Sequence, residues 1–233
     1  MIRCMYAIME LPEILFNVGR NDLKLAVIGL DKVTIEPSLE DWDVYEGRIF
    51  EEIRNSTSLE DVKDDIIFRS YRDLYWSFGM DPTKLRVSSE ALLRRIVNGL
   101  NLWRVSNIVD IVNLASAHHK IPIGLIDISK IQGSLQVRQA KPDEVFTRIG
   151  GETKVCRGRE IVLADEEKIV CFGYATHDSD HTKVTSKSKS IYVVMYGSPE
   201  VSMDYLETST YDTLLLMKKW IRCKPIGIRY IQC

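Results

Sequence analysis

The chain has 233 residues, of which 45% are hydrophobic, and its formal net charge is −2. This length suits one large domain or two small ones, and the composition excludes general disorder. The near-neutral charge argues against a protein that gathers polyanions by bulk positive charge, although a local basic face would still suit RNA.

The first residues of the sequence do not predict a signal peptide. MIRCMYAIMELPEILFNVG is interrupted by Glu10, Pro12 and Glu13 and lacks the small-residue pattern of a signal-peptide cleavage site. No apolar run approaches the roughly 18–20 residues that a membrane span needs. The five cysteines are scattered without the spacing of a zinc site. We therefore expect a soluble cytoplasmic protein with no membrane contact, metal or cofactor.

Helices are expected in the first half of the chain. The predicted elements are a strand or strand pair over 23–35 with a turn near Gly29, a helix over 58–78 and a helix over 88–99. Ser58 with Asp61 three residues on forms a capping box, and Gly79 ends that helix. Ser88 or Ser89 is the expected N-cap of the next helix.

A third helix is expected to begin after Ser106. After it, the spacing of the apolar residues changes from that of helices to that of strands. Short segments rich in β-branched residues follow, and they predict strands over 123–128, 133–140, 160–165, 168–174 and 190–197, with a closing helix over 203–220. This order predicts an α+β fold with a mostly antiparallel β region. We expect a single domain over 1–233, with an N-terminal extension over 1–57, a core over 58–200 and a C-terminal helix and tail over 201–233.

The third helix carries an unusual polar strip. Asn107, Asp110 and Asn113 fall three residues apart, and no Lys, Arg or Glu occurs from Ser106 to Ala117. Apolar residues cover the rest of the helix, so the strip should be shielded from bulk water. Buried polar groups need hydrogen-bond partners. The three side chains therefore either tie the helix to neighbouring loops or line a polar pocket.

Other polar clusters admit two interpretations each. The loop over 177–189 is either solvated or borders a pocket through Asp178 and Lys183, with Lys183 contacting a phosphate or carboxylate. Arg94, Arg95 and Arg104 are either surface residues, of which Arg94 pairs with Glu90, or parts of a basic strip that contacts RNA.

The order of motifs over about residues 85–200 resembles a known family. In that family an Asn-x-Val-Val-Asp-x-x-Asn helix leads into a Pro-x-x-x-x-Asp strand, then a strand ending in Val-Arg, a glycine turn and a strand ending in Ala-Asp. The matching positions are Asn107, Val109, Asp110, Asn113, Pro122, Asp127, Gly133, Val137, Arg138, Gly151, Ala164 and Asp165. Together they resemble the B3/B4 domain of the phenylalanyl-tRNA synthetase beta subunit, and residues 77–95 and 177–185 resemble free-standing proteins built on that domain.

The resemblance implies a function. In the synthetase this domain hydrolyses the ester between a wrong amino acid and the tRNA 3′ end, a reaction that a positioned water can perform on an activated ester. The implied activity here is trans-editing of mischarged aminoacyl-tRNA, with tRNA as partner. The alternatives are a non-catalytic module that binds tRNA or an amino-acid-like ligand, and a structural protein whose pocket has been lost.

Three functional positions of the synthetase differ in this chain. An arginine before the helix, a histidine after the following proline and a glutamate after the polar loop align with Trp103, Gly124 and Val194 or Met195. The synthetase's amino-acid discrimination therefore does not transfer, and no residue is assigned a catalytic role. The expected substrate-binding residues are Asn107, Asp110, Asn113, Gly124, Trp103, Asp178 and Lys183.

Overall fold

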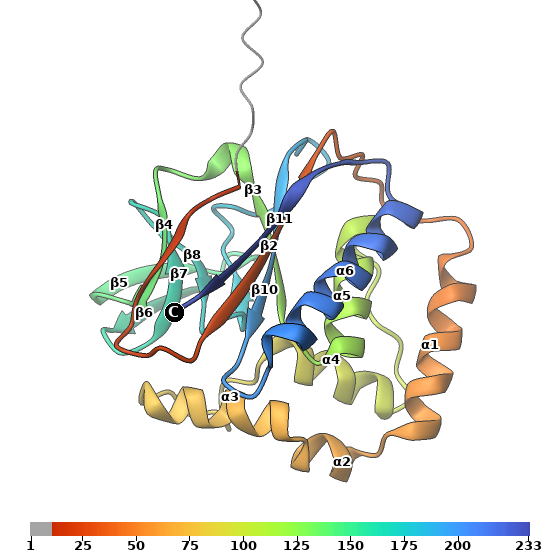
Figure 1. The fold of residues 1–233 in the computed structure, drawn as a ribbon, viewed down its shortest axis with the longest axis horizontal. Helices are drawn as coiled ribbons and strands as arrows, with labels where there is room; N and C mark the ends of the chain where they lie inside the picture. The colour runs from red at the N-terminus through yellow and green to blue at the C-terminus, as the bar shows by residue number, and fades with distance from the viewer. Residues whose placement is uncertain (1–10) are drawn as a thin grey trace, which may run out of the picture.

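The computed structural model describes residues 11–233 and is built from six α-helices and eleven strands within that range (Figure 1). The helices are α1 Trp42–Ser56, α2 Leu59–Asp64, α3 Ile66–Ser77, α4 Ser88–Val97, α5 Asn107–His119 and α6 Met203–Trp220. The strands are β1 Ile14–Asn17, β2 Lys24–Asp31, β3 Ile123–Asp127, β4 Leu135–Gln139, β5 Pro142–Thr147, β6 Thr153–Arg157, β7 Ile161–Ala164, β8 Ile169–Phe172, β9 His177–Asp178, β10 Ile191–Gly197 and β11 Lys224–Gln232.

The strands form two sheets and a hairpin. One sheet has the order β1-β4-β7-β8-β9, the other has the order β11-β2-β10-β3, and β5 pairs with β6. All pairs are antiparallel except β1 with β4. Helices α5 and α6 pack on the four-stranded sheet, while the five-stranded sheet lies on its other side (Figure 1). The predicted α+β architecture with a mostly antiparallel β region is confirmed.

Strand β10 is the centre of the four-stranded sheet. It pairs with β2 along one edge and β3 along the other, and all seven of its residues are buried. A strand buried on both faces reads as a continuous apolar run, which the segment IYVVMYG is. This arrangement places Gly124 of β3 opposite Val194 of β10.

Two of the predicted helix starts agree closely with the structure. Helix α6 has the predicted bounds, and the Ser202 hydroxyl accepts a hydrogen bond from the Tyr205 N–H. The Ser58–Asp61 capping box is also present at the start of α2. In both places a local sequence signal satisfies N–H groups that the first turn of a helix leaves free.

Two other expectations were wrong. The helix predicted over 58–78 is divided at Asp65, whose carboxylate caps α3 by accepting from the N–H groups of Ile67 and Phe68. Neither serine caps α4, because Val87 occupies the N-cap position. Ser89 instead donates from its hydroxyl to the Lys120 carbonyl, so it joins α4 to the end of α5.

Several elements of the structure were not predicted. They are α1, β1, the β5–β6 hairpin and β11. Of the two alternatives for 23–35 the single strand is correct, and Gly29 lies inside it instead of at a turn. The four cysteines within residues 11–233 are free, while Cys4 lies outside the described residues. None of the helices in residues 11–233 is long and apolar enough to cross a membrane.

Candidate functional site

Asn107 ties the start of α5 to the chain before α1. Its side-chain N–H donates to the Thr34 carbonyl at 2.9 Å, and its side-chain oxygen accepts from the N–H of Glu36 at 3.2 Å and of Ile108 at 2.8 Å. Its own N–H donates to the Glu36 carbonyl at 2.8 Å. The residue is 1% exposed, so these main-chain bonds satisfy its amide in a dry environment.

Asp110 performs a similar task one turn further on. It is buried, and one carboxylate oxygen accepts from the Val105 N–H at 2.9 Å. Burial raises the pKa of Asp110, and the bond from Val105 acts against that rise. The first two members of the polar strip thus hold the entry to α5, and Asn113 lies half-buried on the next turn.

Replacement of Asn107 by Ala should lower the free energy of unfolding by about 1–3 kcal/mol, because it leaves the buried Ile108 N–H and the partly buried main-chain groups of Thr34 and Glu36 without their partner. Urea denaturation measures this loss. Asn113→Ala, at a half-buried position of the same strip, is the matched control and should cost less. Equal stability of the Asn107 variant and the wild type would contradict the anchoring role.

Trp103 lies on the surface with 58% of its area exposed. The Arg95 guanidinium stacks over its ring at 4.0 Å from the centroid and donates to the Asn101 carbonyl at 2.6 Å. The two predicted residues are therefore brought together, one from the end of α4 and one from the connection to α5.

The other two predicted RNA-contacting arginines make ion pairs. Arg104 contacts Asp43 and Glu46 of α1, each at 2.5 Å. Arg94 pairs with Glu90, one turn before it on α4, at 2.8 Å. The Arg104 guanidinium thus meets two carboxylates, whereas the Arg94 guanidinium belongs to a wider group of arginines described below.

Gly124 and Asp178 are adjacent although 54 positions separate them in the chain. A Cβ atom built on Gly124 would stand 2.7 Å from the Asp178 Oδ1 atom and 3.4 Å from the Tyr196 ring. The other carboxylate oxygen of Asp178 accepts from the Leu125 N–H at 3.1 Å. The absence of a side chain at Gly124 is therefore what admits the Asp178 carboxylate to this edge of β3.

The Asp178 carboxylate sits among buried polar groups. Burial raises its pKa to about 6, and the bond from Leu125 opposes the rise. Burial, and then the charge of Asp178, raise the pKa of the Cys171 thiol well above its ordinary value. The buried Tyr196 hydroxyl lies beside the Cys171 thiol. Cys171 therefore stays a thiol near neutral pH, and Asp178 is the group that changes charge close to neutrality.

Cys171 and Tyr196 were absent from the predicted set. Both lie in strands buried along their whole length, so their sequence pattern indicates only core. Their place beside Asp178 follows from tertiary pairing, in which Cys171 of β8 lies opposite Asp178 of β9.

The polar loop over 177–189 is folded against the β-sheets. Asp127, at the end of β3, accepts from the Ser188 hydroxyl, and its N–H donates to the Thr182 carbonyl at 2.9 Å. Lys183 pairs with Asp180 at 2.6 Å, and its carbonyl accepts from the Lys130 ammonium. The loop is thus anchored at several points after it leaves Asp178.

Asp165, another position of the family pattern, organises the turn between β7 and β8. Its carboxylate accepts from the N–H groups of Gln132, Glu167 and Lys168 at 2.7–3.0 Å. Together with Asp127, it shows that two acidic positions of the pattern hold loops in place.

Four of the seven predicted substrate-binding residues fall into two groups. Asn107 and Asp110 lie in the first turn of α5, whereas Gly124 and Asp178 meet beyond its last turn. Helix α5 has 13 residues and is therefore about 20 Å long. The first group bonds to main chain near residues 34–36 and 105. In the second group, Gly124 leaves room for the partly buried Asp178 carboxylate.

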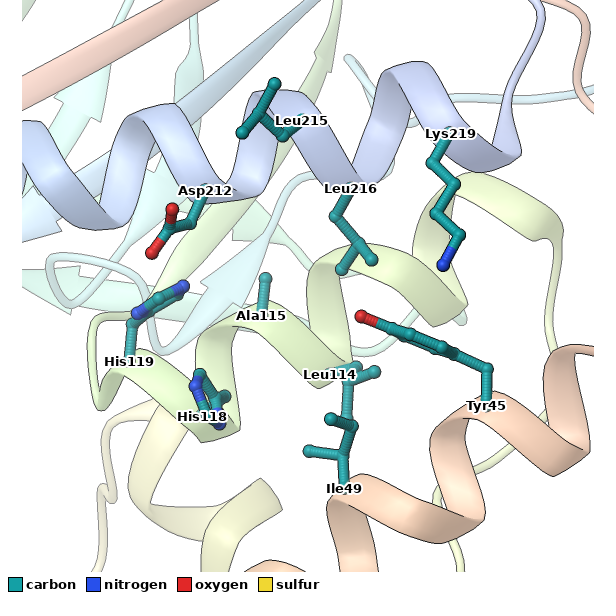
Figure 2. Close-up of a pocket in the computed structure, with 10 residues that line it drawn as sticks. All are labelled: Tyr45, Ile49, Leu114, Ala115, His118, His119, Asp212, Leu215, Leu216 and Lys219. Atoms are coloured by element: carbon teal, nitrogen blue, oxygen red, sulfur yellow. The ribbon is translucent and has the colours of Figure 1, made fainter.

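A separate hollow of about 330 Å³ opens between α1, α5 and α6 (Figure 2). Its lining residues are Tyr45, Ile49, Leu114, Ala115, His118, His119, Asp212, Leu215, Leu216 and Lys219. Figure 2 shows Asp212 beside His119 at one end and Lys219 beside Tyr45 at the other. Burial and the neighbouring His118 lower the pKa of His119 to about 4, so that ring is neutral at pH 7.

Comparisons with known proteins agree with the sequence pattern. A family model described as the B3/4 domain matches residues 70–209. The phenylalanine–tRNA ligase beta subunit of Fusobacterium nucleatum is 30% identical over 140 residues, which cover 60% of this chain and 17% of that protein. The corresponding subunit of Ralstonia nicotianae is 34% identical over 108 residues, covering 46% of this chain and 13% of that protein.

Among solved structures, an N-terminal fragment of the phenylalanyl-tRNA synthetase beta subunit from Pyrococcus horikoshii gives a TM-score of 0.43 at 12% identity, covering 95% of this chain and 53% of that one. That likeness is too distant to add to the fold described above. In sequence, the matched segment is a small fraction of the length of the synthetase subunits.

Proposed function

The chain belongs to the B3/4 domain family, and on that premise we propose that it hydrolyses the ester of mischarged aminoacyl-tRNA, with the Asp178 carboxylate as general base. The observation that carries this proposal is the partly buried carboxylate, with a pKa of about 6, beside the bare backbone of Gly124. A base whose pKa lies just below the working pH is mostly ionised and still a competent proton acceptor.

The proposed reaction needs only water as a second reactant. A water oxygen attacks the ester carbonyl carbon and its proton passes to Asp178. The carbon–oxygen bond to the ribose then breaks, the ribose oxygen takes the proton, and free amino acid and tRNA are released. An aminoacyl ester is activated, so positioning and proton transfer can carry the acceleration.

The Asp178 carboxylate lies next to the chain position that the resemblance gives to a histidine. The synthetase histidine aligns with Gly124, and in this chain the Asp178 carboxylate comes within 2.7 Å of where a Cβ of residue 124 would stand. We propose that a titratable group is kept at this place but is supplied from β9 instead of β3. The amino acid removed then differs from that of the synthetase, because the Trp103 and Val194 positions differ as well.

The test is a deacylation panel. Purified protein is mixed with tRNAs that each carry a non-cognate amino acid, and release of the amino acid is followed against the spontaneous rate. For at least one combination of tRNA and amino acid, the wild type should release the amino acid faster than the spontaneous rate. Asp178→Asn should release it at the spontaneous rate. If every pair decays at the spontaneous rate, the hydrolytic function is excluded, and saturable binding of the same tRNAs would then favour the second candidate.

That second candidate is binding of an amino-acid-like ligand without turnover. Two observations favour it: Asn107 and Asp110 are bonded to main chain, and the hollow between α1, α5 and α6 has a volume within the usual range of small-ligand pockets. Titration with free apolar amino acids distinguishes the two, because a binding module saturates without releasing product. Either activity would be exercised where charged tRNA is present, in the cytoplasm.

A further inference from the structure

Three arginines surround one buried carboxylate on the face formed by α3 and α4. The Glu90 side chain is 2% exposed, and its Oε1 atom lies 2.8 Å from Arg94, 3.7 Å from Arg72 and 3.8 Å from Arg86. Arg72 comes from α3, Arg86 from the connection before α4, and Arg94 from α4 itself. A single carboxylate thus gathers guanidinium groups from three separate places in the chain.

The charges of this group do not balance. Three guanidinium groups and one carboxylate leave an excess of two positive charges. Only Arg94 is within hydrogen-bond distance of Glu90, through its Nε atom, so its two terminal nitrogens are free of that bond. The Arg86 side chain is 51% exposed and contacts Glu90 only at 3.8 Å. The Arg72 side chain also donates to the Lys63 carbonyl, so the N–H donors available to a ligand are mainly those of Arg86 and the terminal nitrogens of Arg94.

We propose that Arg72, Arg86 and Arg94 form a binding site for a phosphate group of the RNA backbone. Guanidinium forks match the geometry of phosphate oxygens, and Glu90 holds the three forks close together before the ligand arrives. The assignment of RNA as the source of the phosphate rests on the proposed function, whereas the anion site itself rests on the arginines alone.

The arginine site lies close to the strand that carries Asp178. The Ser88 N–H, two residues after Arg86, donates to the Ala175 carbonyl at 3.4 Å, and Ala175 precedes Asp178 by three residues. The chain that carries Arg86 therefore runs beside the chain that leads to the carboxylate. A backbone phosphate held by the arginines would anchor an RNA whose acylated end reaches Asp178.

Acidic side chains of the neighbouring helix α2 are engaged elsewhere. Glu60 pairs with Lys63 at 2.8 Å, and Asp61 accepts from the Ser58 hydroxyl and N–H at the start of the helix. Asp65, which follows α2, pairs with Lys120 at 2.5 Å. These three carboxylates therefore pair with groups other than the arginines, on a chain whose overall charge is slightly negative.

Replacing Arg72 and Arg86 together by Gln tests the site and leaves the Arg94–Glu90 pair intact. The affinity for tRNA should fall about tenfold at 0.1 M salt. The slope of log affinity against log salt concentration should decrease in magnitude by about one to two. Fluorescence anisotropy with labelled, uncharged tRNA measures both. Arg48→Gln with Arg222→Gln, two exposed arginines outside the site, is the control with the same change of charge.

Two readouts separate this inference from the proposed function. In the wild type, titration with inorganic phosphate should shift the Nε–Hε NMR signals of Arg86 and Arg94 and leave that of Arg48 unchanged, whether or not the protein is a hydrolase. An unchanged tRNA affinity in the double variant overturns the RNA assignment. Shifts with inorganic phosphate but not with tRNA overturn it as well, and no shift with either overturns the anion site.

Discussion

Asp178→Asn is expected to slow deacylation of aminoacyl-tRNA by about 100-fold or more, which is the usual contribution of a positioned general base. Asn has the same shape, and its carbonyl oxygen can still accept the bond from the Leu125 N–H that holds the side chain. The loss should therefore appear in the rate of single-turnover hydrolysis and not in tRNA affinity. Asp180→Asn removes a carboxylate two residues away, where Asp180 pairs with Lys183, and should leave the rate within a few-fold of wild type.

The pH dependence gives an independent check on the same residue. A general base acts in its ionised form, so the wild-type rate should rise as the pH is raised through about 6 and then level off. Asp178→Asn should lose that rise. A variant that keeps the full pH profile at a lower overall rate would assign the base to another group.

Ionisation of Asp178 should lower the stability of the fold, although it should raise the rate of hydrolysis. Because folding raises the pKa of Asp178 above its ordinary value, the native state favours the neutral acid. The associated stability is fully present below the unfolded pKa near 4 and is lost as the pH rises through about 6. Asp178→Asn should therefore be at least as stable as the wild type at pH 8, and a large loss of stability there would show that the ionised carboxylate is needed for the fold.

Gly124→Ala is expected to destabilise the protein by about 1–3 kcal/mol and to abolish hydrolysis, because the new Cβ would approach the Asp178 Oδ1 atom to 2.7 Å and displace the carboxylate. Urea denaturation gives the first effect and the deacylation rate the second. The deacylation rate should fall further than the loss of folded protein explains, since a shift of about one ångström in a reacting group is enough to impair catalysis.

A matched control and a second substitution identify the cause. Gly47→Ala on α1 places a Cβ in open space within a helix, and it should raise stability by about 0.5–1 kcal/mol. If the Gly124→Ala penalty comes from the clash with Asp178, then adding Asp178→Ala should remove most of it, and the two substitutions should not be additive. Additive losses would place the clash elsewhere, for instance against the Tyr196 ring.

The fold was predictable where the signals are local. Helix α6 has a serine cap and an apolar face, and α2 has a capping box, so both follow from neighbouring residues. The β5–β6 hairpin escaped prediction because its strands are mostly exposed and carry charged residues, which gives no alternating pattern. Strand β1 has four residues and gains its pairing from β4, more than 100 positions away. Helix α1 could have been found, since Trp42, Glu46, Phe50 and Ile53 recur at helical spacing on its buried face.

The candidate site was predictable only in part. The absence of long charged side chains on α5 correctly indicated that Asn107 and Asp110 are buried. Periodicity cannot say which groups meet a buried amide, and the partners at Thr34 and Glu36 come from a segment about 70 residues earlier. Gly124 and Asp178 entered the prediction for separate reasons, and only the alignment of β3 beside β9 brings them together.

Strand β9 has two residues and pairs with Cys171 and Phe172 at the end of its sheet, and the Asp178 carbonyl also accepts from the Ile149 N–H at 3.2 Å. A segment this short can lose its acidic residue while the long pairings of β10 with β2 and β3 keep their own hydrogen bonds. Descendants of one ancestral gene could therefore acquire, retune or discard the proposed chemistry while their architecture stayed constant. The group to compare first across such descendants is the pair at positions 124 and 178, because a bulky residue at one requires a small residue at the other.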